Sequence, residues 1–122
     1  MLQHRSKISV ADNSGALDLM LIGIPGRGRK RVAKLGDVVT AVVKKAAPSG
    51  AVKKSQIVKV VIVRLRRSTR RPDGTHIKFS DNAAVLIDGT GNLVGTRILG
   101  PVAAEVRKAG FAKVVSQAAE VF

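Results

Sequence analysis

Short runs of β-branched and aliphatic residues, separated by turns that contain glycine or proline, dominate the chain. Such runs predict strands, because Val and Ile favour extended backbone and short apolar runs bounded by turns are typical of buried strands. The predicted strands cover residues 8–12, 16–24, 38–44, 57–67 and 83–87. Many short strands joined by tight turns favour a closed or nearly closed β-barrel, and therefore a mainly β fold.

The strand predicted at 57–67 has an apolar centre and a basic end. Residues 72–74, Pro-Asp-Gly, are typical of a turn that reverses the chain, which then returns through Ile77 and Phe79. The sequence therefore predicts a hairpin that projects from the barrel, with a basic tip at residues 66–71.

The hydrophobic period changes after Gly100-Pro101. Phe111, Val114, Val115 and Ala118 follow the spacing of one helical face, and Gly110 is placed to end a shorter helix at 103–108. We therefore expect short C-terminal helices. At 122 residues the chain has the size of one domain, with the barrel at 1–100 and the helical part at 101–122.

Composition narrows the class of protein without naming a function. The chain contains no Cys, so neither a disulfide nor a thiolate metal site is expected, and a reducing compartment is the natural setting. Residues 1–7 lack the apolar block of a signal peptide, and no apolar run approaches the roughly 20 residues that span a bilayer. We expect no membrane association.

The distribution of charged residues along the chain is the most informative feature of the composition. Lys and Arg number 22 against 8 Asp and Glu, and the whole net charge of +14 lies between Arg27 and Arg71, where Asp37 is the only acid. A concentrated positive surface attracts polyanions and releases their counterions on binding, so it indicates a nucleic-acid partner. The alternative is a solvated face that serves solubility, but that role rarely uses a single sign of charge.

The basic residues expected to contact RNA lie in two main elements, the loop around 27–31 and the hairpin, with further lysines between them. They are Arg27, Arg29, Lys30, Arg31, Lys44, Lys45, Lys53, Lys54, Arg64, Arg66, Arg67, Arg70 and Arg71. Readers of single strands stack bases on aromatic rings, yet Phe79 and Phe111 match core positions and there is no Tyr or Trp. Phosphate contact and shape recognition of folded RNA are therefore expected.

The residues that could perform catalysis are few. His4 and His76 are expected at the surface, and Ser14 lacks the flanking glycines of a nucleophile elbow, so 12–15 is interpreted as an Asx-type turn. Residues 26–28 resemble the start of a phosphate-binding glycine motif without its remainder, and 88–92 lacks the later Glu of a calcium loop. No enzyme activity, metal or cofactor is predicted.

A series of motifs resembles the universal large-subunit ribosomal protein numbered fourteen and covers nearly the whole chain. The matching segments are Val10-Ala11-Asp12-Asn13-Ser14-Gly15, Gly36-Asp37, Pro48, Gly50, Val52-Lys53-Lys54, Arg70-Arg71-Pro72-Asp73-Gly74, Phe79, Asn82, Gly95-Thr96-Arg97-Ile98-Leu99-Gly100-Pro101-Val102 and Glu105. The compact length resembles the bacterial or organellar form.

The resemblance implies a five-stranded β-barrel with a projecting β-ribbon and small C-terminal helices. It also implies a structural constituent of the large ribosomal subunit that binds large-subunit rRNA, lies beside neighbouring large-subunit ribosomal proteins, and contacts small-subunit rRNA at an intersubunit bridge. Its setting would be the ribosome of a bacterial cytoplasm, mitochondrion or plastid. The alternative from the residues alone is a free architectural protein that binds nucleic acid.

The resemblance finally implies a docking patch for a ribosome-silencing factor at Thr96, Arg97 and Lys113. Without the family resemblance, a Thr-Arg pair after Gly95 is more typical of a turn cap followed by a solvated charge. Both interpretations stay open at this point.

Overall fold

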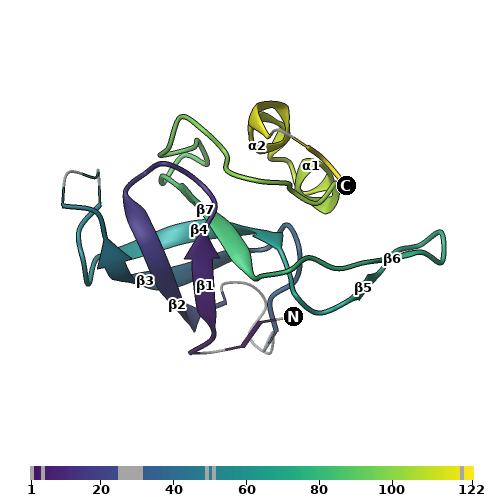
Figure 1. Ribbon diagram of the computed structural model, residues 1–122, viewed down its shortest axis with the longest axis horizontal. Coiled ribbons are helices and arrows are strands. Elements are labelled where there is room, and N and C mark those ends of the chain that lie inside the picture. Colours follow the sequence, from purple (N-terminus) through teal and green to yellow (C-terminus); the bar gives the residue numbers. More distant parts are fainter. Residues whose placement is uncertain (1, 4, 25–31, 49, 51, 119) are drawn as a thin grey trace.

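The structure is a computed structural model that describes residues 2–3, 5–24, 32–48, 50, 52–118 and 120–122. Its centre is a closed β-barrel with the strand order β1-β2-β3-β4-β7 (Figure 1). The barrel strands are β1 (Lys7–Val10), β2 (Ala16–Gly23), β3 (Val38–Ala46), β4 (Ile57–Arg64) and β7 (Ala83–Ile87). Neighbouring strands pair antiparallel, except that β1 and β7 close the barrel in parallel, with Ser9 opposite Ala83.

Strand β7 and the second half of β4 are buried on both faces. Alternate residues of a strand point to opposite sides, so Val60 and Ile62 of β4 join the barrel interior while Val61 and Val63 point outward. All four are fully buried. The outward pair belongs to a second apolar cluster that includes Val106 of the C-terminal part, which explains the unbroken apolar run in the sequence.

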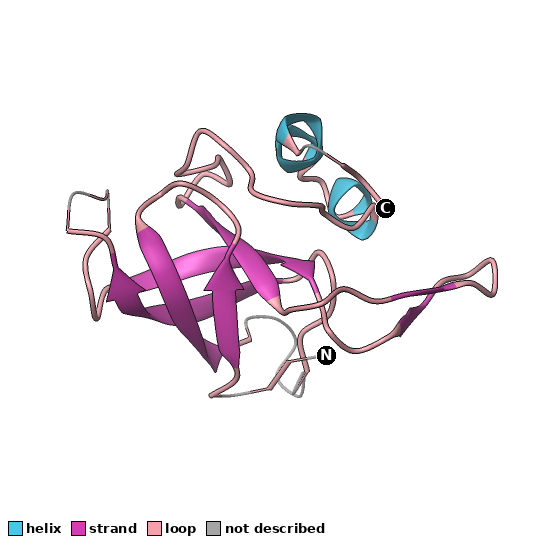
Figure 2. Cartoon of the chain, in the orientation of Figure 1, coloured by secondary structure: helices cyan, strands magenta, loops and turns pink. Residues whose placement is uncertain are grey.

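Two short helices, α1 (Glu105–Lys108) and α2 (Ala112–Gln117), cover this outer face. In Figure 2 they lie together on one side of the barrel, whereas the two-stranded ribbon of β5 (Thr69–Arg70) and β6 (His76–Ile77) projects away from it. Gly36 in the turn before β3 has φ +83°, and an added Cβ would lie 3.0 Å from the carbonyl oxygen of Glu105. This glycine allows the turn to pack closely against α1.

The predicted architecture is confirmed, and the differences concern element ends. The strand expected at 8–12 is Lys7–Val10, because the carboxylate of Asp12 turns inward and bonds to β7. The strand expected at 57–67 ends at Arg64, where a register shift follows Ile62 and the chain turns into the ribbon. The helix expected at 103–108 begins at Glu105.

Candidate nucleic-acid interface

The projecting hairpin presents its basic side chains to solvent. Arg66, Arg67 and Arg70 are all exposed. The tip is held by a hydrogen bond from the amide of Arg71 to the carbonyl oxygen of Thr75 at 2.8 Å. The ribbon therefore holds arginines away from the barrel, where a large polyanion can reach them.

One carboxylate lies at the hairpin tip. Asp73 Oδ1 accepts hydrogen bonds from the hydroxyl of Thr75 at 2.6 Å and from its amide at 3.0 Å. These two bonds, with a further contribution from the charge of Arg71, lower the pKa of the Asp73 carboxyl below its ordinary value. Asp73 is thus an ordered, ionised acceptor within the turn, and it reduces the positive charge of the tip.

Arg71 connects the hairpin to the helical part. Its Nε donates a hydrogen bond to Glu105 Oε1 at 3.0 Å, and Nη2 lies 2.8 Å from the same oxygen in an ion pair. Both side chains are 24% exposed, so the pair is largely shielded from water. Arg71 therefore positions the ribbon against α1, and two of its three guanidinium nitrogens face Glu105.

Arg64 is also occupied within the protein. Its Nε lies 3.2 Å from Asp81 Oδ1, and Nη1 donates to the carbonyl oxygen of Leu99 at 3.2 Å. The side chain is 12% exposed. This arginine links the end of β4 to the return of the hairpin and to the segment before α1, so its geometry is that of a structural residue.

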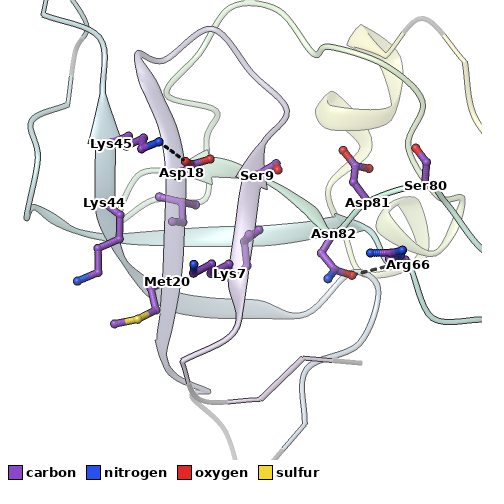
Figure 3. A pocket seen from close by; sticks show the side chains of 12 residues that line it. Lys7, Ser9, Asp18, Met20, Lys44, Lys45, Arg66, Ser80, Asp81 and Asn82 are labelled. Carbon is purple, nitrogen blue, oxygen red and sulfur yellow. Dashed lines mark hydrogen bonds and ion pairs between the residues drawn. The ribbon is translucent and has the colours of Figure 1, made fainter.

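A groove of about 510 Å³ lies over the outer face of β1. In Figure 3, β1 lies between Lys44 and Met20 on one side and Arg66 and Asn82 on the other. We call this feature the β1 groove. Its lining residues are Lys7, Ile8, Ser9, Asp18, Leu19, Met20, Lys44, Lys45, Arg66, Ser80, Asp81 and Asn82.

The segment at Thr96 and Arg97 is positioned by the turn that follows β1. Asn13 Oδ1 accepts hydrogen bonds from the amides of Thr96 at 2.7 Å and Arg97 at 3.0 Å, and Asn13 Nδ2 donates to Thr96 Oγ1 at 2.9 Å. The side chains of Arg97 and Lys113 are exposed. Ile98 and Val114, which follow them, belong to the same buried cluster, so both segments cover the same outer face of the barrel.

Residues 12–15 form the predicted Asx-type turn, since Asp12 Oδ1 accepts hydrogen bonds from the amide and the hydroxyl of Ser14 at 3.1 and 2.6 Å. Within the described residues, no three His, Cys, Asp or Glu side chains come together in a way that could hold a metal ion. No helix of the described ranges is long and apolar enough to cross a membrane.

A family model for ribosomal protein L14p/L23e matches residues 1–122. The chain belongs to the ribosomal protein L14p/L23e family. Membership implies a structural constituent of the ribosome, with rRNA and ribosomal proteins as partners. The resemblance predicted from the sequence motifs is thereby confirmed.

The L14p/L23e fold gathers some of the sequence-predicted residues and separates others. Lys44, Lys45 and Arg66 come from different parts of the chain and meet in the β1 groove. Lys53 and Lys54 are exposed in the connection between β3 and β4 and do not line it. The predicted contacts at Arg27, Arg29, Lys30 and Arg31 lie outside the described residues.

The groove also contains residues that sequence reasoning missed. Lys7 and Ser9 are exposed on β1, while Ile8 between them is buried. This alternation was a usable signal for an outward polar face. Nothing local in the sequence indicates that Ser80 and Asn82, beyond the hairpin, reach the same place.

Proposed function

We propose that this L14p/L23e protein binds folded large-subunit rRNA through its basic central segment, with the exposed hairpin arginines as principal contacts. The observation that carries the proposal is the ribbon of β5 and β6, which projects away from the barrel with Arg70 exposed in β5 and Arg67 exposed just before it. Guanidinium groups bind phosphate oxygens through a planar fork of donors, and a ribbon can enter a space between RNA helices that the barrel cannot.

The same proposal includes the intersubunit face of the large subunit, contact with small-subunit rRNA at a bridge, and neighbouring large-subunit proteins. A bacterial or organellar ribosome is the proposed setting. For a silencing factor, the proposed dock is Thr96, Arg97 and Lys113. Support for this patch comes from the exposure of Arg97 and Lys113 and from the near-neutral balance of the C-terminal part, which favours a protein partner.

Salt dependence of binding tests the hairpin assignment. Each phosphate that a protein ceases to neutralise flattens the log-log dependence of affinity on salt by about 0.7 on a single strand and about 0.9 on a duplex. Arg67→Ala with Arg70→Ala should therefore flatten it by about 1.4–1.8. Filter binding to large-subunit rRNA transcribed from the source organism would measure this. The matched control is Arg107→Ala with Lys108→Ala, which removes the same charge from exposed positions of α1.

If the two double variants give equal slopes, the hairpin is not part of the RNA-binding surface.

Sucrose-gradient sedimentation separates the proposed ribosomal constituent from a free architectural protein. The ribosomal constituent should migrate with large subunits at moderate salt, whereas a free DNA-binding protein would stay near the top of the gradient and bind duplex DNA as well as rRNA.

A further inference from the structure

The polar side chains of the β1 groove are mainly hydrogen-bond donors and cations, and they lie beside apolar surface. It lies on the outer face of the barrel, at the base of the hairpin and distinct from the hairpin tip. Its volume of about 510 Å³ falls in the range of about 300–1,000 Å³ that is typical of small-molecule sites. A double helix would require a broader surface, so the size is that of a single unit of a chain.

Each of the two carboxylates of the groove has a cationic partner. Asp81 pairs with Arg64 at 3.2 Å, and Asp18 Oδ2 lies 3.8 Å from Lys45 Nζ. Within the described part of the chain, no carboxylate pairs with Lys7 or Lys44. The groove therefore has an excess of positive charge that an anion can neutralise.

Asn82 presents a donor of fixed orientation. Its Oδ1 accepts a hydrogen bond from the amide of Arg66 at 2.8 Å, as the dashed line in Figure 3 marks. The oxygen is thus directed toward the hairpin base, and the Nδ2 amino group is left for another acceptor. Among the described residues none accepts a hydrogen bond from it.

We propose that the β1 groove binds one nucleotide of a single RNA strand. Lys7 and Lys44 contact its phosphate from one side of β1, and the Arg66 guanidinium with Asn82 Nδ2 contacts the RNA strand from the other side. The base lies against Met20, because a thioether makes favourable contacts with the edge of an aromatic ring. This inference rests on the proposed rRNA binding and adds to it a second contact, separable from the hairpin.

Removing the two lysines tests the inference. Lys7→Ala with Lys44→Ala should flatten the salt dependence of binding to the source organism's large-subunit rRNA by about 1.4. If affinities converge near 1 M salt, this change corresponds to about 25-fold weaker binding at 0.1 M. The control is Lys59→Ala with Lys108→Ala, because both lysines are exposed and neither lines the groove.

A substitution that keeps the fold gives the second test. Asn82→Asp preserves the acceptor for the Arg66 amide and replaces the Nδ2 donor by a charged oxygen. We expect an unchanged melting temperature and weaker rRNA binding. RNA should also protect Lys7 and Lys44, but not Lys59, from acetylation.

The outcomes distinguish a failure of the β1 groove as an RNA site from a failure of the proposed rRNA binding. If the groove variants bind as their control does while the hairpin variant is weakened, the groove is not an RNA site and the hairpin assignment stands. If the unaltered protein does not bind the rRNA, the proposed function itself is wrong. Asn82→Asp could also lose rRNA binding because it lowers the melting temperature. If it does so, and Lys7→Ala with Lys44→Ala leaves binding unchanged, the groove is not an RNA site.

Discussion

Asp12 is a buried carboxylate that accepts three hydrogen bonds inside the molecule. It is 5% exposed, and besides the two hydrogen bonds from Ser14 its Oδ2 accepts one from the amide of Leu86 at 2.9 Å. The residue therefore connects the turn after β1 to the middle of β7, and its removal would leave a buried amide without an acceptor.

We predict that Asp12→Ala lowers the free energy of unfolding by about 3 kcal/mol, because buried donors lose a charged acceptor. Asp18→Ala is the matched control. Its carboxylate is 50% exposed and lies 3.8 Å from the Lys45 ammonium, and exposed pairs of this kind contribute at most about 1 kcal/mol. Urea titration followed by circular dichroism would measure both; equal losses would contradict the structural role of Asp12.

Sequence reasoning identified the local part of this arrangement and missed the distant part. The turn at 12–15 was predictable because Asp and Ser bond to nearby backbone. The bond to Leu86 was not, since the pattern around a residue carries no information on a partner so far along the chain. The same limit applies to Arg64 and Arg71, which were predicted as RNA contacts from local charge and are paired with Asp81 and Glu105.

Among the elements, the hairpin is connected to α1 by an ion pair. The ribbon strands β5 and β6 have two residues each, and a short isolated two-stranded ribbon is marginally stable in water. The Arg71–Glu105 pair connects the residue that follows β5 to the first residue of α1. A hairpin that is held in place loses less entropy on binding RNA than a mobile one.

We predict that Glu105→Ala weakens rRNA binding about two- to fivefold, although it makes the protein more positive, because the hairpin then pays an ordering cost of up to about 1 kcal/mol. Hydrogen exchange at the amides of Arg71 and Gly74 should become faster. Glu120→Ala is the control, with the same change of charge at an exposed position. If both variants bind rRNA more tightly by the same factor, the pair has no positioning role.

At the scale of the molecule, two apolar clusters share β4. Val60 faces the barrel interior and Val61 the C-terminal helices, and both are fully buried. A barrel and a helical part that share a strand cannot unfold independently without exposing it. We therefore propose that residues 1–122 form a single domain.

This proposal predicts one calorimetric transition. Val60→Ala and Val61→Ala should each destabilise the protein by about 2 kcal/mol and shift that transition as a whole, since truncation of a buried side chain leaves a cavity. A separate low-temperature transition in Val61→Ala alone would mean that the helical part unfolds by itself.

The overall architecture was predictable because strand length, turn residues and the change of period at Gly100-Pro101 all favour the same fold. The register of the strands and the exposure of individual side chains were not predictable from the sequence. The β1 groove illustrates this, since Lys7, Lys44 and Asn82 become neighbours only through the pairing of β1 with β2 and β7 and of β2 with β3.

The parallel closure of the barrel has a consequence for synthesis of the chain. Ser9 of β1 finds its partner Ala83 only after the rest of the barrel has been made, and translation at about 5–20 residues per second leaves β1 waiting for roughly 4–15 seconds. During that time one edge of β1 has unpaired backbone groups, and the nascent protein already carries most of its positive charge. The growing chain is then able to associate with polyanions or other strands before its own last strand arrives, so its safe biogenesis depends on how quickly β7 follows.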